Sequence, residues 1–261
     1  MKQYIVDAFT DKIFHGNQAA VCVLENWLPE KLMMNIAKEN NFSETAFTVK
    51  CGDKYHLRWF TPSGEINLCG HATLATSYIL FKFYETSAKK LVFSTLSGDL
   101  IISRADDYIV MDFPAYHYSE TSVTEQMAKA MGAKPSKAYF DRDLLLVYED
   151  EDIIRNMAPD FEAMKLLDKE IVGVTAPGHE YDCVSRCFAP KLKINEDPVT
   201  GSIHCMIAPY WAERLGKHTI SAYQASERGG EMKCEIRGDR VVIYGKAALF
   251  SSSELNITIL S

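Results

Sequence analysis

Apolar and polar residues alternate in many short runs along this chain, and such runs predict β-strands. Two longer runs, residues 72–84 and 203–215, are apolar on nearly every side and predict buried helices. Pro29 and Pro159 each suit the first position of a further helix. The expected strands cover residues 3–9, 19–24, 43–49, 55–60, 90–94, 99–103, 109–113, 144–148, 170–175, 183–188, 219–224, 231–236 and 241–244. The two halves therefore present similar elements in a similar order.

The halves also repeat one motif. The segment RWFTPSGEIN at residues 58–67 matches RCFAPKLKIN at residues 186–195, with Arg, Phe, Pro, Ile and Asn in register. Each segment leads to a glycine at the start of a predicted helix, Gly70 or Gly201, where backbone N–H groups can approach an anion. We expect an α+β fold of two pseudo-symmetric lobes, residues 1–118 and 132–261. Each lobe is expected to be a curved mixed β-sheet or open barrel wrapped around its central helix, with the site between the lobes.

Composition and charge argue against several classes of function. The formal net charge of −7 argues against a nucleic-acid or anionic-membrane partner. The apolar run near residues 74–83 is too short to span a bilayer and includes Lys82. No secretory signal is expected, because Asp7 interrupts the N-terminal apolar residues. Seven cysteines without a CxxC motif indicate a reduced, cytoplasmic protein, and the scattered histidines predict no metal site.

Glu44 is the first candidate for chemistry. It begins a predicted strand, and its expected counterpart in the second lobe, near Thr175, has no acid. A repeat that carries a carboxylate in only one copy has lost its symmetry at that point. Glu44 is then either a general base whose pKa is raised by partial burial, or a solvated strand-edge residue or helix-end ion-pair partner.

Five further residues are ambiguous from the sequence alone. His71 follows Gly70 at a helix start, where the helix dipole disfavours the imidazolium, so a neutral ring is expected. Asp197 and Ser202 flank Gly201 and are either substrate ligands or helix caps. Asn17 is either a polar clamp on a substrate or a turn residue. Cys69 is more typical of a buried cysteine than of a nucleophile.

The motifs together resemble the phenazine biosynthesis-like (PhzF-like) isomerase family, within the diaminopimelate epimerase-like fold. The resemblance covers nearly the whole chain and rests on several segments jointly. These are DAFT at 7–10, GNQAA at 16–20, SETAF at 43–47, CGHAT at 69–73, RCFAP at 186–190 and EDPVTGS at 196–202.

This resemblance implies cofactor-free proton transfer on a small carboxylated metabolite, with no metal. Glu44 matches the family's acid/base glutamate, and the cleft histidine, aspartate and serine match His71, Asp197 and Ser202. Gly70 and Gly201, with the N–H groups behind them, would hold the carboxylate of the substrate and the developing enolate-like charge. Dimers are common in the family, so a homodimer is one expectation, although no interface can be read from the sequence.

Two alternatives remain open. Epimerases of this fold use one thiol from each lobe, and Cys69 stands where one of them is expected. Asp197 falls near the place of the other thiol, which makes a two-thiol epimerase or racemase a poorer match. A non-catalytic binding protein that keeps the fold is the third hypothesis, and the intact Glu44, His71 and Asp197 speak against it.

Overall fold

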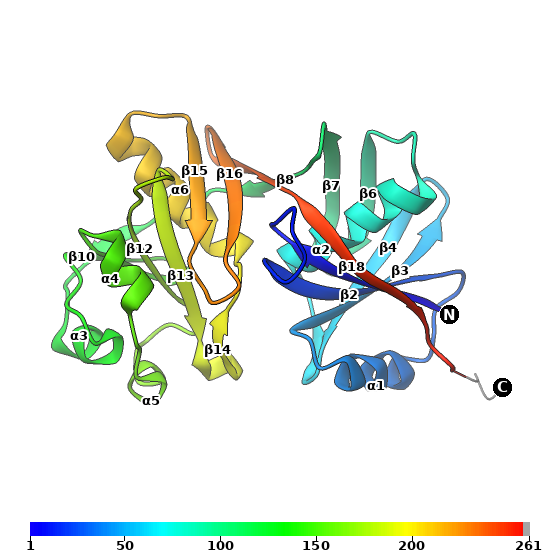
Figure 1. The fold of residues 1–261 in the computed structure, drawn as a ribbon, viewed down its shortest axis with the longest axis horizontal. Coiled ribbons are helices and arrows are strands. Elements are labelled where there is room, and N and C mark those ends of the chain that lie inside the picture. Colours follow the sequence, from blue (N-terminus) through cyan, green and yellow to red (C-terminus); the bar gives the residue numbers. More distant parts are fainter. Residues whose placement is uncertain (258–261) are drawn as a thin grey trace. The chain divides into compact units, whose positions relative to one another are not determined.

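The computed structural model describes residues 1–257, and the chain divides into two compact units (Figure 1). The first unit comprises Met1–Met111 and Tyr244–Ser261, and the second comprises Asp112–Ile243. In the part of the chain that the structure describes, no helix is both long and apolar enough to cross a membrane.

The first unit is a curved mixed sheet with two main helices. Its strands lie in the order β18–β1–β2–β3–β4–β6–β7–β8, with the short β5 paired to β4. The pairs β2–β3 and β4–β6 are parallel, and α1 and α2 provide the crossovers. The strands are β1 (Lys2–Ala8), β2 (Asn17–Leu24), β3 (Glu44–Cys51), β4 (Lys54–Thr61), β5 (Gly64–Ile66), β6 (Lys90–Thr95), β7 (Gly98–Ala105), β8 (Tyr108–Pro114) and β18 (Ala247–Glu254).

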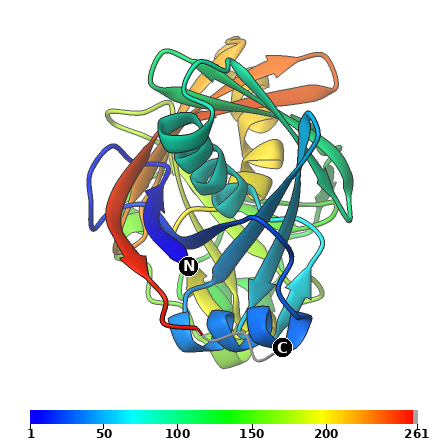
Figure 2. The same cartoon turned by 90° about the vertical axis from the view of Figure 1, so that its right-hand side faces the viewer.

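The central helix α2 (Gly70–Ile79) is buried on almost every side, as its apolar sequence predicts, and continues into the π-helical segment η1 (Leu80–Tyr84). It packs against β1, β2, β3 and β18 (Figure 2). Its buried hydroxyl groups are satisfied within the helix, because Thr73, Thr76 and Ser77 each donate to the carbonyl four residues earlier. These three hydroxyl groups can therefore lie in the core at little cost. The helix α1 (Glu30–Asn40) packs on β3 and β4 instead.

The second unit repeats this plan. Its strands lie in the order β9–β10–β11–β12–β13–β15–β16, β14 pairs with β13, and the parallel pairs are β11–β12 and β13–β15. The strands are β9 (Ser119–Thr121), β10 (Lys137–Phe140), β11 (Leu144–Val147), β12 (Val172–Pro177), β13 (Cys183–Ala189), β14 (Ile194–Asp197), β15 (Thr219–Gln224), β16 (Gly230–Arg237) and β17 (Arg240–Gly245). The helices are α3 (Glu125–Met131), α4 (Glu151–Asn156), α5 (Phe161–Met164), the short 3₁₀ helix η2 (Pro190–Leu192) and α6 (Gly201–Leu215).

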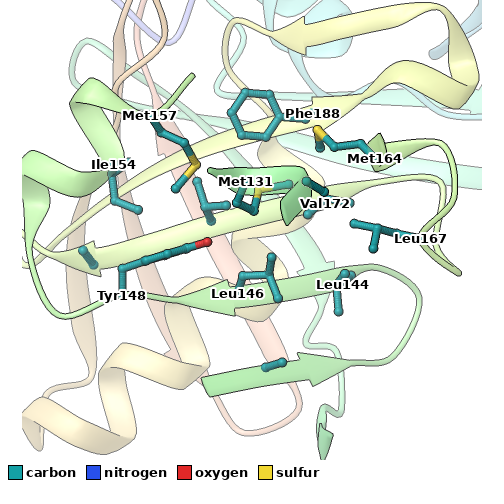
Figure 3. Close-up of a cluster of buried hydrophobic side chains, with 14 of the residues drawn as sticks. Met131, Leu144, Leu146, Tyr148, Ile154, Met157, Met164, Leu167, Val172 and Phe188 are labelled. Carbon is teal, nitrogen blue, oxygen red and sulfur yellow. The ribbon is translucent and has the colours of Figure 1, made fainter. Parts of the chain in front are cut away.

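The core of the second unit has two parts. A cluster of buried Leu, Met and Val side chains, with Tyr148 and Phe188, packs beneath the small helices (Figure 3). The central helix α6 packs on β15 and β16. Pro209 lies inside this helix and cannot donate to the carbonyl of Cys205. That carbonyl instead accepts a hydrogen bond from the N–H of Tyr116 at 2.9 Å, so the buried acceptor is satisfied.

The internal repeat predicted from the sequence is confirmed by matching side-chain contacts. Arg58 lies over the ring of Phe60 and forms a bidentate pair with Glu65 on the next strand. The second unit makes the same arrangement, in which Arg186 lies over Phe188 and pairs with Glu196. Each arginine thus fixes the hairpin that leads to a central helix. The predicted α+β fold, with one central helix in each curved sheet, is confirmed.

The structure corrects the predicted assignment of residues 244–257 to the C-terminal lobe. The strand β18, which the alternation did not predict, pairs with β1 and completes the sheet of the first unit. In the second unit the equivalent edge is filled by β9, which pairs with β10. Hydrophobic alternation identifies a strand but not its partner, so the return of the chain could not be predicted. Residues 258–261, which the prediction also placed in the C-terminal lobe, lie outside the part of the chain that the structure describes.

Candidate active site

Glu44 is the first residue of β3, and its side chain is buried, with 7% of its surface exposed. Strand pairing identifies its counterpart in the repeat. Thr45 lies opposite Phe60 in the first unit, and Val172 lies opposite Phe188 in the second. The residue before Val172 is Ile171, not the predicted Thr175, so the second copy again has no carboxylate at this position. The interpretation of Glu44 as a solvated strand-edge residue is therefore wrong.

His71 lies in the first turn of α2 and meets groups from both sides of its ring. Its Nε2 atom is 3.1 Å from Glu44 Oε2 and 3.3 Å from Ser43 Oγ. Its Nδ1 atom is 3.2 Å from Asn17 Nδ2 and 3.5 Å from Cys69 Sγ. Glu44 Oε2 nevertheless makes no aligned hydrogen bond within residues 1–257. The contact is therefore an ion-pair approach whose ring N–H is not directed squarely at that oxygen.

The electrostatics of this pair differ from the predictions. Burial alone would raise the pKa of Glu44, but attraction to His71 and hydrogen bonds from His71, Ser43 and Cys69 outweigh it and lower the pKa. Burial alone would lower the pKa of His71, but the acidic groups of Cys69 and Glu44 raise it well above 6.5. The predicted raised pKa of Glu44 and neutral ring of His71 are both wrong.

The sizes of the two effects explain why the helix dipole does not keep His71 neutral. A charge in the first turn of a helix feels about 0.3 to 1 kcal/mol from the dipole. Two unit charges 3.1 Å apart attract by about 5 kcal/mol at an effective dielectric constant of about 20. The lowered pKa of Glu44 keeps its carboxylate ionised at neutral pH, and the raised pKa of His71 favours the imidazolium beside it.

Cys69 is the residue immediately before α2 and is buried, as predicted, with 7% exposed. Burial, together with the neighbouring charge of Glu44, raises the pKa of its thiol above 9.0, although His71 opposes part of this effect. Cys69 therefore carries its proton at neutral pH. It lies against His71 as a weak donor or acceptor rather than as a thiolate.

Asn17 is held in place by a tight loop. Gly16 before it has φ of +65°, and a Cβ atom there would lie 2.1 Å from the carbonyl oxygen of Ala8. The buried carboxylate of Asp7 accepts from the N–H of Phe14 and fixes the same loop. Asn17 itself is 1% exposed and faces His71, and turning its amide by 180° offers the ring either an N–H or an oxygen. It can thus serve both protonation states of His71.

Gly70 leaves the start of α2 open. A Cβ atom added at Gly70 would meet no other atom within 4 Å, so nothing in the described chain packs there. Cys69 is the N-cap residue, and its thiol faces the His71 ring of the same helix. Binding of an anion by the first N–H groups of α2 stays a prediction from the sequence.

The start of α6 carries the second group of predicted residues. Asp197 ends β14, and its carboxylate accepts from the hydroxyl of Thr200 at 2.5 Å. The buried Gln224 accepts from the N–H of Thr200 at 2.8 Å and donates to the carbonyl of Asp197 at 2.7 Å. Gly201 is the first residue of the helix, and Ser202 accepts from the guanidinium of Arg142 at 3.0 Å. The N-cap residue of α6 is Thr200, so neither Asp197 nor Ser202 occupies the N-cap position.

Each unit therefore assembles part of the predicted set. Asn17, Glu44, Gly70 and His71 meet around the start of α2 in the first unit. Asp197, Gly201 and Ser202 meet around the start of α6 in the second. Sequence reasoning missed Ser43, Arg142 and Gln224. Ser43 could have been found, since it precedes Glu44 in the same motif, whereas Arg142 and Gln224 are distant in sequence from the groups that they contact.

Comparison with known proteins identifies related chains. The family model described as phenazine biosynthesis-like protein matches residues 6–253. An uncharacterised isomerase of Pseudomonas aeruginosa is 47% identical over 252 residues, which covers 97% of each chain. A solved structure of the phenazine biosynthesis protein PhzF family from Enterococcus faecalis is 50% identical, with a TM-score of 0.97 over 98% of this chain and 99% of that one. A predicted epimerase from P. aeruginosa is 17% identical with a TM-score of 0.75 over 98% and 99% of the chains, a likeness of fold alone.

Proposed function

Because the chain belongs to the phenazine biosynthesis-like (PhzF-like) family, we propose that it is an isomerase that moves a proton on a small carboxylic acid. Its relatives include a protein named an isomerase. The observation that carries the proposal is the buried pair of Glu44 and His71, 3.1 Å apart, beside the open start of α2. A buried carboxylate with a charged partner, beside an open helix start, suits proton abstraction next to a carboxyl group.

The proposed reaction begins with ionised Glu44. Its carboxylate removes a proton from a carbon of the substrate, and the electron pair of the broken C–H bond moves into the adjacent unsaturated system. The imidazolium of His71 and the N–H groups behind Gly70 stabilise the negative charge that develops. Glu44 exchanges this proton with solvent while the intermediate persists and then delivers a proton to a different carbon, which shifts the double bond and restores the carboxylate. No net proton or electron is gained or lost.

The protein also gives Glu44 a suitable basicity. In the resting enzyme, His71 lowers the pKa of Glu44 and keeps it ionised. An anionic substrate adds negative charge and excludes water, and both changes favour the protonated carboxyl group. Glu44 therefore becomes a stronger base when the substrate is bound. The further assignment of Asp197, Gly201 and Ser202 to the same substrate remains a prediction from the sequence.

The epimerase alternative receives one supporting observation, which is the position of Cys69 beside His71 and Glu44. A thiol acts as a base only as thiolate, and burial raises the pKa of Cys69. We therefore favour Glu44 as the base. A binding protein without catalysis would have no need to keep an ionised carboxylate in a buried site at this cost in desolvation.

The test is exchange of substrate protons with solvent deuterium. The enzyme is incubated in D2O with a panel of small α-amino, α-hydroxy and β,γ-unsaturated carboxylic acids, and deuterium is located by NMR. We expect incorporation at the carbon that receives the proton in at least one unsaturated acid. Glu44→Gln should slow it by roughly a hundred- to ten-thousandfold, because a general base is lost.

Cys69→Ala is the matched variant for the alternative and should retain most of the exchange. A racemase would instead place deuterium at the α-carbon with inversion, and would depend on Cys69. Exchange in Glu44→Gln at the wild-type rate, or no exchange with any acid of the panel, contradicts the proposal.

A further inference from the structure

Three donor groups of different chemistry converge at the start of α2. Glu44, Cys69 and His71 each offer one ligand atom, and these atoms all lie within 4.8 Å of one another. All three side chains belong to the first unit, and each is buried with 6–7% exposed. A carboxylate, a thiol and an imidazole are the three ligand types that Zn²⁺ accepts in proteins.

The three ligand atoms lie close together, although they are not yet at the spacing of a tetrahedral ion. The usual Zn–S, Zn–N and Zn–O bond lengths place neighbouring ligand atoms about 3.3 to 3.7 Å apart. Cys69 Sγ is 3.5 Å from His71 Nδ1, and Glu44 Oε2 is 3.1 Å from His71 Nε2. His71 can offer only one of these nitrogens to an ion, so a small shift of the ring or carboxylate is needed. The three residues lie on β3 and α2, whose packing holds them near each other before any ion arrives.

An unsatisfied atom points to the same ligand. Glu44 Oε2 is buried and lacks a hydrogen bond within the described residues. A buried oxygen without an aligned hydrogen bond costs free energy, and a coordinated cation removes that cost. With the thiol deprotonated, Glu44 and Cys69 together carry two negative charges, which match the charge of a divalent ion.

We propose that Glu44, Cys69 and His71 bind Zn²⁺ through one oxygen, one sulfur and one nitrogen, and that the ion blocks the acid/base carboxylate. Three protein ligands leave the fourth position for water or for an exogenous anion. The blocking effect, unlike the binding, rests on the proposed function of Glu44. The site would make the enzyme reversibly sensitive to free zinc.

Proton balance makes the binding measurable. The metal binds the deprotonated thiol, so Cys69 releases one proton for each ion bound. Protonated His71 must also release a proton before its nitrogen can coordinate. The dipole of α2 opposes a cation, but this effect is weak beside the attraction of two anionic ligands.

The experiment uses the full-length, reduced, chelator-treated protein and titrates it with Co²⁺, followed by Zn²⁺. We expect an intense near-ultraviolet thiolate-to-cobalt band at one ion per chain, which Zn²⁺ then abolishes, with proton release recorded by an indicator. Cys69→Ser should remove the band. Cys51→Ser is the matched control, since Cys51 is an exposed cysteine on β3, and it should retain the band.

A second measurement covers variants that perturb the fold. Excess Zn²⁺ should raise the melting temperature of the wild type, and Glu44→Gln should weaken zinc affinity by at least about tenfold without removing the thiolate band. A band that survives in Cys69→Ser, or disappears in Cys51→Ser, would overturn the proposal, as would a wild type without one.

Zinc binding and the proposed function of Glu44 can each fail without the other. If no acid of the exchange panel reacts, the cobalt titration still decides whether the ion binds. If exchange is found, Zn²⁺ should inhibit it over the same concentration range as the titration, and chelator should restore it. Exchange that persists at saturating zinc would contradict the blocking role while leaving Glu44 as the base.

Discussion

His71 lies in the first turn of α2, and His204 lies in the first turn of α6, the corresponding helix of the repeat. Both rings are buried, yet the pKa of His71 is raised well above 6.5, whereas burial lowers the pKa of His204 to about 4. The difference lies in what each ring faces. Among the described residues, the ring nitrogens of His204 hydrogen-bond to the carbonyl of Thr200, at 2.7 Å, and to the hydroxyl of Ser185, at 3.2 Å.

The partners of His204 fix its proton. Nδ1–H donates to the Thr200 carbonyl, so Nε2 is the acceptor for the Ser185 hydroxyl. Every polar atom of the ring is therefore satisfied in the neutral state. His71 instead faces Glu44, an acid that the second copy of the repeat lacks. The same scaffold thus holds a histidine with a lowered pKa in one unit and one with a raised pKa in the other, and Cys69 and Glu44 beside His71 make the difference.

The starts of α2 and α6 also differ in how their polar groups are held. At the start of α2, nothing in the described chain lies near the Cβ position of Gly70. At the start of α6, Thr200, Asp197 and Gln224 form a connected network of hydrogen bonds, and Arg142 contacts Ser202. At the start of α2, titratable groups lie beside an open position. At the start of α6, hydrogen bonds hold the polar groups in place. We infer that chemistry belongs to the first start and binding to the second.

The largest expected effect comes from His71→Gln, which removes the charge that compensates Glu44. A buried ion pair that loses one partner costs about 3 to 5 kcal/mol in the free energy of unfolding. Burial then raises the pKa of Glu44, so the limb of the pH–rate profile that reports its ionisation moves to higher pH. Urea unfolding at pH 7 and the pH dependence of deuterium exchange measure the two effects.

The sign of the pH dependence provides a check on this comparison. In the wild type the lowered pKa of Glu44 gives stability that is present above its unfolded pKa and lost as the pH falls through the folded value. In His71→Gln the raised pKa reverses this contribution, which is then lost as the pH rises. His204→Gln is the control and should leave the rate profile in place. Equal profiles for the wild type and His71→Gln would contradict the pairing.

His204 gives the next effect, on stability alone. Its folded pKa of about 4 lies below the ordinary 6.5. Between these two pH values the unfolded chain therefore binds a proton that the folded chain does not bind. The resulting stability is fully present above pH 6.5 and falls by about 3 kcal/mol as the pH drops through 4. His204→Gln should lose less stability over that range. Unfolding free energies of both proteins at pH 7, 5.5 and 4 test this, and parallel curves would contradict it.

Ser202→Ala gives the smallest expected effect. It removes the hydroxyl that accepts from Arg142 and tests whether the start of α6 binds the substrate of Glu44. We expect KM to rise less than about tenfold, because one hydrogen bond is worth about 0.5 to 1.5 kcal/mol, while kcat stays unchanged. Ser253→Ala, at an exposed position on β18, is the control. An unchanged KM in Ser202→Ala would separate the two helix starts functionally.

The sequence alone determined the repeat, the two buried central helices and most strands. These follow from local periodicity and from the recurrence of Arg, Phe and Pro, and they need no knowledge of which strands pair. It also indicated that Glu44 has no acidic counterpart, although the counterpart is Ile171 rather than Thr175. The motif resemblance added the family, which the comparisons confirm.

Only the tertiary structure decided the charges of the site and the last strand of the first unit. The pKa values of Glu44 and His71 depend on a contact between residues that are far apart in sequence, and periodicity carries no information on such distances. The convergence of Cys69 on the same pair arises likewise from the packing of β3 against α2. The place of β18 beside β1 depends on which sheet edge remains unpaired, which the folded chain settles and the order of residues does not.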